Sequence, residues 1–263
     1  MVTFGDIIEL LKAGAGPADH TVDKLESGEY NTGVKGIVTA FSASQYVIEQ
    51  AIALGANLII THEGVYYSHQ DQREGLRHDP VYQQKSTLVK NSGLGIYRHH
   101  DAVHRYAPDG IMEGLLRELD WQRYVTEHRP AVSILTIPAA GAGEIADDLK
   151  TRLGISYVRA AGNLSALCVK VGVLVGYRGG GAMTIPLYER DSLDLIIAGE
   201  GPEWETPEYI RDAVHQGRDK ALILLGHAES EAPGMKLAAE RLAARLPGVP
   251  VHFIKEAPVL QIV

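Results

Sequence analysis

The chain has 263 residues, of which 45% are hydrophobic and 22% charged, a composition typical of water-soluble globular proteins. This length predicts one large or two modest domains, and it allows a core to form without disulfide bonds. The net charge of −8 is spread without blocks of like charge, so the sequence gives no sign of a nucleic-acid partner. No apolar run approaches the ~20 residues of a membrane-spanning helix, so we also expect no membrane partner.

The single cysteine, Cys168, cannot form an internal disulfide bond, and its neighbours Leu167 and Val169 predict that it lies in a buried strand. This cysteine usage is typical of a reducing compartment, so we expect a cytoplasmic protein. The N-terminus has no basic flank followed by a continuous apolar region. Instead, Thr3 and Asp6 predict a capping box at the start of a helix with one apolar face.

Strands and helices alternate along the first half of the chain. Short apolar runs predict strands at residues 34–43, 57–60, 95–98 and 131–137. Helices are predicted at residues 45–54, 80–91 and 109–119. The second of these helices has Asp79 as its N-cap and Pro80 in its first turn, and Gly93 ends it.

The second half repeats this order. Strands are predicted at residues 167–176, 193–199 and 221–226. Helices are predicted at residues 142–153, after the glycines near 180, after Thr206-Pro207, and from about residue 234. This alternation predicts an α/β fold of two interlocked units, whose largely parallel sheets are flanked by helices. The expected units are 1–128 and 129–263, and residues 127–132 are the best candidate for a linker.

Polar side chains follow three of the predicted strands. The three clusters are His62 and Glu63; His99, His100, Asp101 and His104; and His227, Glu229 and Glu231. Ligands of open α/β sheets bind at the carboxyl ends of strands, so we expect one site there, between the two units. Imidazole and carboxylate groups are the usual ligands of Zn, Mn and Fe. Two such ions ~3.5–4 Å apart could activate a water molecule and hold a phosphate or carbonyl group.

Other roles for these residues stay open. Three histidines are better explained as surface residues of loops than as metal ligands: His69, His78 and His99. The carboxylates of Glu63 and Glu231 could be solvated or could cap helices. His100 and Asp101 could bind metal directly, or could instead orient an imidazole that does.

Two further features have weaker explanations. The stretch 176–183, GYRGGGAM, could cradle a phosphate with its backbone N–H groups, but a tight turn that needs positive φ explains its glycines equally well. Trp204 either lines a pocket or covers core. The sequence has no Gly-x-Ser-x-Gly elbow, and Cys168 has no catalytic setting, so covalent catalysis has little support.

Taken together, the clusters resemble the NIF-three-like family of dinuclear metal-centre proteins, often labelled GTP cyclohydrolase 1 type 2 homologs. The resemblance covers nearly the whole chain, through GANLIITHE, GIYRHHDAVH, LIIAGE and GHAESEAPGMKLAAERL. The last segment is the most specific, because the family ends with a similar Gly-His-x-Glu-Ser-Glu stretch.

The resemblance implies two divalent metal ions per chain (Zn, Mn or Fe), held by His62, Glu63, His104, His227 and Glu231. The family usually has Thr-His-His where this chain has Thr61-His62-Glu63, and an aspartate where it has His104. These two exchanges leave three imidazoles and two carboxylates. We therefore expect Glu63 and His104 to face the same ion.

The resemblance also implies a homo-oligomer, expected to be a hexamer. The first functional hypothesis is a metal-dependent hydrolase of a nucleotide or another small phosphorylated compound, with Asp101 or Glu229 as the proton acceptor. A GTP cyclohydrolase would be one such hydrolase, although no feature of the sequence indicates recognition of guanine. The alternative is a non-catalytic scaffold that stores, delivers or senses metal.

Overall fold

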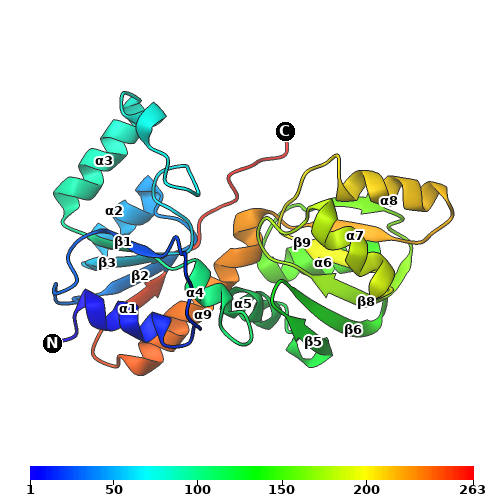
Figure 1. Cartoon of the computed structure of the whole chain (residues 1–263), viewed down its shortest axis with the longest axis horizontal. Helices are drawn as coiled ribbons and strands as arrows, with labels where there is room; N and C mark the ends of the chain where they lie inside the picture. Colours follow the sequence, from blue (N-terminus) through cyan, green and yellow to red (C-terminus); the bar gives the residue numbers. More distant parts are fainter. The chain divides into compact units, whose positions relative to one another are not determined.

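The computed structural model describes residues 1–263, and the chain forms two compact units (Figure 1). Unit 1 consists of Met1–Gly110 and Gly234–Glu256, and unit 2 of Ile111–Pro233 and Ala257–Val263. The chain therefore passes between the units three times, which is the interlocked organisation that the sequence predicts. The first boundary falls after Gly110 and not near residue 128, because the chain from Ile111 onward belongs with the second sheet.

The sheet of unit 1 has five strands in the order β1-β4-β3-β2-β11. Their bounds are Lys24–Ser27, Gly95–Arg98, Leu58–Thr61, Ile37–Ala40 and Val251–Phe253. Strands β4, β3, β2 and β11 run parallel, and only β1 is antiparallel. The central three are buried on both faces, which is why they read as continuous apolar runs. The edge strands β1 and β11 have no such run, and the sequence did not predict them.

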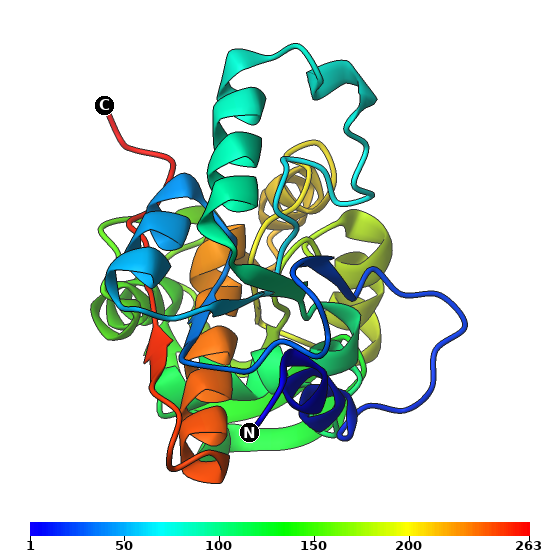
Figure 2. The same ribbon diagram turned by 90° about the vertical axis from the view of Figure 1, so that its left-hand side faces the viewer.

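Helices cover both faces of this sheet (Figure 2). Helices α2 (Gln45–Ala53) and α3 (Pro80–Ser92) pack on one face, where their apolar residues join Ile59 and Ile96 in one core cluster. On the other face lie α1 (Phe4–Lys12) and the C-terminal part of α9, whose Met235 carbonyl accepts a hydrogen bond from Thr39. The predicted capping box of α1 is present.

The sheet of unit 2 has six strands in the order β5-β6-β8-β9-β10-β7. Their bounds are Val125–Arg129, Val132–Gly141, Leu167–Val173, Leu195–Ala198, Ala221–Leu224 and Arg159–Gly162. Strands β8, β9 and β10 are parallel, and the remaining three pair antiparallel at the two sides. Residues 127–132, the candidate linker, thus form a hairpin inside this sheet.

The helices of unit 2 are α5 (Gly110–Glu118, one residue of which belongs to unit 1), α6 (Ala142–Leu153), α7 (Gly181–Arg190) and α8 (Thr206–His215). Helices α7 and α8 cover one face of the sheet, where Tyr188 and Ile210 pack on Leu222. Three short helices complete the chain: η1 (Glu74–Leu76), α4 (Asp101–His104) and η2 (Gln122–Tyr124).

Helix α9 spans His227–Arg245 and so begins about seven residues before its predicted start. Pro233 lies inside it, and a proline is a usual sign of a helix boundary. The early start matters for the site, because it places His227 and Glu231 four residues apart on one helix rather than in a loop.

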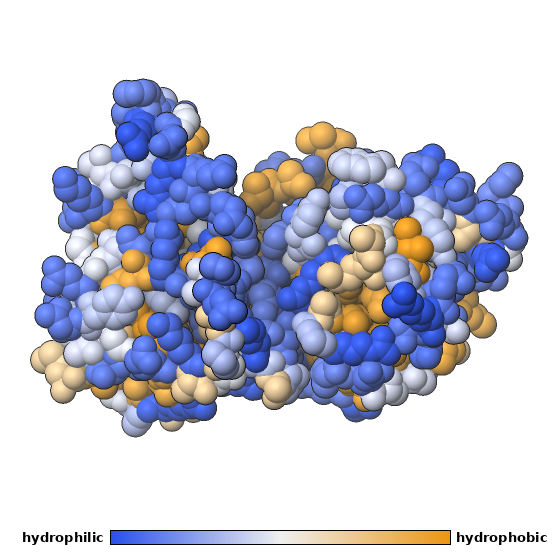
Figure 3. All heavy atoms as spheres, in the orientation of Figure 1, coloured by the Kyte–Doolittle hydropathy of each residue, from blue (hydrophilic) through white to orange (hydrophobic).

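Burial alternates only at the start of strand β8, whose last three residues are all buried. Cys168 is buried, as predicted, but its neighbour Leu167 is exposed, because successive side chains of a strand point to opposite faces. The face of the molecule drawn in Figure 3 is mostly hydrophilic, with apolar atoms in small groups. No helix has the length and apolar character needed to cross a membrane.

Candidate metal centre

In unit 1, three imidazoles come together where β3 and β4 end. His62 directly follows β3, His100 precedes α4, and His104 is the last residue of α4. The ring of His62 stacks on that of His100, with centroids 4.4 Å apart, and meets the edge of His104 at 4.9 Å. The three residues each offer a ligand atom within 4.8 Å of the others. Three imidazoles at this spacing could hold one metal ion.

Each of these rings has its Nδ1 atom engaged with an acceptor. His100 Nδ1 donates to Asp101 Oδ1 at 2.8 Å, and His104 Nδ1 donates to Asp109 Oδ2 at 2.8 Å. His62 Nδ1 lies 3.3 Å from the carbonyl oxygen of His99. A neutral imidazole that donates through Nδ1 keeps the lone pair of Nε2. Histidines that bind metal commonly have their other nitrogen fixed in this way.

Helix α4 is held in place by Asp23, from the loop before β1. Its carboxylate accepts hydrogen bonds from three consecutive backbone N–H groups, those of His100, Asp101 and Ala102, at 2.6–2.7 Å. In return, Asp101 Oδ2 accepts the N–H of Val22 at 2.8 Å. Although burial alone raises the pKa of Asp101, the hydrogen bonds from Val22 and His100 outweigh it and lower the pKa to about 2.

The other histidines of this region have different environments. His99 is fully buried and is not a surface residue of a loop. Its Nε2 atom lies 3.1 Å from the hydroxyl of Tyr106. Burial lowers the pKa of His99 to about 3. His69 and His78 are exposed in the loop between β3 and α3, as expected.

The carboxylate of Glu63 lies between a guanidinium and an imidazole. Arg98 Nη2 donates to Glu63 Oε2 at 2.8 Å, and His100 Nε2 lies 3.5 Å from Oε1. Burial raises the pKa of Glu63, but the positive charges of His100, His62 and Arg98 outweigh it, and the net shift is downward. Glu63 is therefore neither a helix cap nor a solvated surface carboxylate.

In unit 2, a second imidazole–carboxylate cluster lies at the start of α9. His227 Nδ1 donates to Glu200 Oε1 at 2.8 Å, and its Nε2 lies 3.1 Å from Glu231 Oε2. The side chain of Glu231 is buried. Ser230, between them in sequence, accepts the N–H of Gly176 at 2.9 Å and so fixes the loop after β8 against α9.

The glycines of residues 176–183 serve this packing. Gly176 has φ +62°, and a Cβ atom there would overlap with Glu231 Oε1. The N-terminus of α7, where a phosphate could bind, is already occupied, because Gly181 N–H donates to Glu205 Oε2 at 2.7 Å. The stretch is thus a turn that needs glycine, and the structure gives no support to a phosphate cradle.

Gly176→Ala is expected to displace the Glu231 carboxylate. A non-glycine residue at positive φ costs about 1 kcal/mol of folding free energy, and the overlap with Oε1 adds a shift of the carboxylate. Gly217→Ala is the matched control, because Gly217 has φ +77° and no atom within 4 Å of its added Cβ. Both variants should lose stability in urea unfolding, but only Gly176→Ala should bind Zn²⁺ more weakly. Equal metal affinity in the two would contradict this.

The geometry of unit 1 separates Glu63 from His104. Glu63 forms a group of potential ligands with His69 and His100, whereas His104 groups with His62 and His100, and no group of three contains both. The expectation that the two exchanged residues face one ion therefore finds no support here. The residue common to both groups is His100.

Asp109→Asn is expected to weaken metal binding without unfolding the protein. The Asp109 carboxylate fixes the orientation of His104, and removal of such a partner lowers metal affinity by ~10–100-fold. Asp120→Asn is the control, because Asp120 is exposed and pairs only with Arg123. Calorimetric titration with Zn²⁺ measures the difference, and equal affinity in both variants would exclude this role of Asp109.

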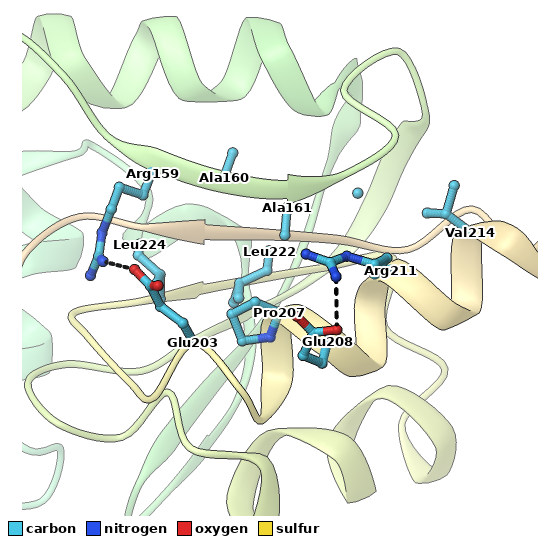
Figure 4. Close-up of a pocket in the computed structure, with 11 residues that line it drawn as sticks. Arg159, Ala160, Ala161, Glu203, Pro207, Glu208, Arg211, Val214, Leu222 and Leu224 are labelled. Atoms are coloured by element: carbon cyan, nitrogen blue, oxygen red, sulfur yellow. Dashed lines mark hydrogen bonds and ion pairs between the residues drawn. The ribbon is translucent and has the colours of Figure 1, made fainter.

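A separate groove of about 710 Å³ lies in unit 2 between β7 and α8 (Figure 4). Its floor is apolar, with Leu222 and Leu224, and its charged residues pair with each other, as Arg159 does with Glu203. None of the residues in the three polar clusters lines it. Trp204 does not line it either and is 76% exposed, so it covers no core.

Several residues of the site have no signal in the sequence. Asp23, Arg98, Asp109 and Glu200 each contact a predicted site residue. Glu200 lies in the segment LIIAGE that carries the resemblance, and Asp109 was predicted only as the cap of the helix that ends at Leu119. Their roles depend on pairings between distant parts of the chain, which motif spacing does not report.

Comparison with known proteins identifies the family of the chain. Residues 21–258 match the family described as Duf34/NIF3 (NGG1p interacting factor 3). A Haemophilus influenzae protein named GTP cyclohydrolase 1 type 2 homolog is 26% identical over 233 residues, covering 86% of each chain. A Clostridium perfringens protein of the same name is 25% identical over 251 residues, covering 89% of this chain and 87% of the relative.

Solved structures share the fold. A Bacillus cereus protein related to NIF3 has a TM-score of 0.78 at 16% identity, covering 99% of both chains. Reduced HcgD from Methanocaldococcus jannaschii has a TM-score of 0.71 at 15% identity, covering 97% of this chain and 98% of the other. Since the family match spans most of the sequence, this chain belongs to the Duf34/NIF3 family.

Proposed function

We propose that the protein binds two divalent metal ions per chain, through His62, Glu63, His104, His227 and Glu231, with His100 as a sixth ligand. The observation that carries the proposal is shared by four imidazoles. His62, His100, His104 and His227 each have Nδ1 next to a carbonyl or carboxylate oxygen, the arrangement that commonly orients a histidine to bind metal through Nε2.

The donor set fits a hard or borderline divalent cation. Imidazole nitrogens and carboxylate oxygens without thiolates favour Zn, Mn or Fe. Glu200 and Asp109 also support the proposal, because they accept hydrogen bonds from Nδ1 of His227 and His104. Such a bond orients the imidazole and raises its basicity as a ligand. Bound divalent ions would supply Lewis-acid polarisation of a substrate oxygen.

We propose further that the protein is a hydrolase of a nucleotide or another small phosphorylated compound. The shared name of its relatives, GTP cyclohydrolase 1 type 2 homolog, supports a nucleotide. Asp101 is a poor proton acceptor, because both of its oxygens are hydrogen-bonded and its pKa is about 2. Glu229, on the first turn of α9 and close to Gly226, is the better candidate for this role.

A panel of nucleotides and generic phosphoesters tests this function, with Mn²⁺ or Zn²⁺ added to protein freed of metal. Turnover should require the metal and should be lost in His227→Ala, whereas the exposed control His78→Ala should keep it. Tight metal binding without turnover on any substrate would instead favour the scaffold that stores, delivers or senses metal. The hexamer that the resemblance implies is tested on the same protein by light scattering.

A further inference from the structure

Arg98 contacts both Glu63 and His69 through its side chain. It is the last residue of β4 and is 1% exposed. Its Nη2 donates to Glu63 Oε2 at 2.8 Å, and its Nη1 donates to the backbone carbonyl of His69 at 2.7 Å. Nη2 also lies 2.9 Å from the ring atom Nδ1 of His69. A single guanidinium thus fixes the carboxylate and the loop that follows it.

The hydrogen bond from Arg98 gives the two carboxylate oxygens of Glu63 different environments. Oε2 is occupied by the guanidinium, whereas Oε1 lies on the side of His100, 3.5 Å from its Nε2. Oε2 also accepts the N–H of Gly64 at 3.3 Å, so Oε1 is the oxygen that this arrangement presents to a metal on the side of His100. The positive charge of Arg98 also balances the negative charge of Glu63, so the pair as a whole is neutral, like an imidazole.

The same contact determines the tautomer of His69. A guanidinium carries N–H donors and no acceptor, so Nδ1 of His69 must accept the hydrogen bond from Nη2. The neutral ring then carries its proton on Nε2, and neither nitrogen has a free lone pair. His69 lies close enough to Glu63 and His100 to complete a metal-binding group, but it cannot act as a ligand while Arg98 is in place.

We propose that Arg98 is a positioning residue that selects the metal ligands of unit 1, making Glu63 a one-oxygen ligand and excluding His69. The proposal rests on the function proposed above, that these residues bind metal. The contacts that Arg98 makes are all with potential ligands or the loop that carries them, since Nη1 and Nη2 bond to Glu63 and His69 while Nε–H is buried without an acceptor. The guanidinium is thus aimed at the ligand cluster.

Titration of metal-free protein with Co²⁺ tests the proposal, because the visible absorption of bound Co²⁺ reports the number and type of its ligands. We expect Arg98→Met to bind one of two Co²⁺ ions ~10–100-fold more weakly, the effect of losing a residue that orients a ligand. Its spectrum should also change, because His69 becomes available. Adding His69→Ala to Arg98→Met should reverse that change, whereas His69→Ala alone should leave stoichiometry and spectrum as in the natural chain.

Arg73→Met is the matched control, because Arg73 binds the carboxylates of Glu26 and Asp71 in the same unit. Arg98→Lys keeps the charge and, being less disruptive, covers the case in which Arg98→Met does not fold. Arg98→Lys should restore part of the Co²⁺ affinity. It should not exclude His69 as a ligand, because the lysine ammonium lacks the planar, forked donors of a guanidinium.

Two results would overturn the proposal. In the first, Arg98→Met and Arg98→Lys bind Co²⁺ with the same spectrum and affinity as the natural chain. In the second, His69→Ala alone binds fewer Co²⁺ ions than the natural chain. If the natural chain itself binds no Co²⁺, the proposed function fails first, and the two failures are thus distinguishable.

Discussion

His104→Ala is expected to reduce the metal content from two equivalents to about one per chain. His104 shares its group only with His62 and His100, so its loss should affect one ion and spare the other. The affinity for that ion should fall by more than ~100-fold, because even the loss of a residue that only hydrogen-bonds to a ligand lowers metal affinity by ~10–100-fold. Elemental analysis of protein purified without added metal or chelator measures this directly.

His227→Ala should remove an equivalent as well, and the double variant should bind none. Exposed His78 provides the control, since His78→Ala should keep both equivalents. A metal content of one in the natural chain, unchanged by His104→Ala, would mean that the three imidazoles of unit 1 bind no metal. In that case the family's dinuclear chemistry could not be assumed for this chain.

The metal-free protein is expected to be most stable near pH 6.5 and to lose stability on both sides. Burial alone lowers the pKa of His227, but the hydrogen bonds and charges of Glu231 and Glu200 outweigh it and raise the pKa to about 9. The folded state then binds more protons than the unfolded state between pH 6.5 and 9. Stability from this group is therefore complete below pH 6.5 and is lost as the pH rises through 9, by about 3 kcal/mol.

The loss of stability below pH 6.5 comes from histidines whose pKa is lowered in the folded state. Burial, followed by the charge of His62, lowers the pKa of His100 to about 4 despite its bond to Asp101. Between pH 6.5 and 4 the unfolded state binds more protons, so stability falls as the pH is lowered. Buried His99, whose pKa is about 3, acts in the same direction.

Urea unfolding with a chelator present, from pH 4 to pH 10, measures this profile. His227→Gln should flatten the alkaline limb and keep the acid limb. Metal affinity should rise with pH up to about 9, because a metal must displace the proton of His227. A stability that does not change between pH 6.5 and 9 would contradict the coupling of His227 to Glu231 and Glu200.

The sequence by itself determined the central strands, most of the long helices and the strand ends at which polar residues gather. Runs such as Leu58–Thr61 and Ala221–Leu224 are buried on both faces of parallel strands, and such strands have a short, continuous apolar pattern. Once strands and helices alternate, the carboxyl ends of strands are where ligands bind. His62 and His227 could therefore be selected from their positions alone.

Helix α9 marks the limit of local reasoning. Pro233 indicates a helix boundary in the sequence, yet it lies inside a helix that begins at His227. Local propensity is a weak guide when tertiary packing opposes it. Here Ser230 bonds to Gly176, and Thr39 bonds to the carbonyl of Met235, so packing holds the chain helical on both sides of the proline.

Only the tertiary structure decided which groups support the site. Asp23 caps α4 from 77 to 79 residues away along the chain, and Arg98 reaches Glu63 across 35 residues. Such pairs depend on sheet register, because Thr61 and Arg98 are direct neighbours on β3 and β4. A periodic pattern encodes which face of a strand is buried, but it does not encode which distant residue that face will meet.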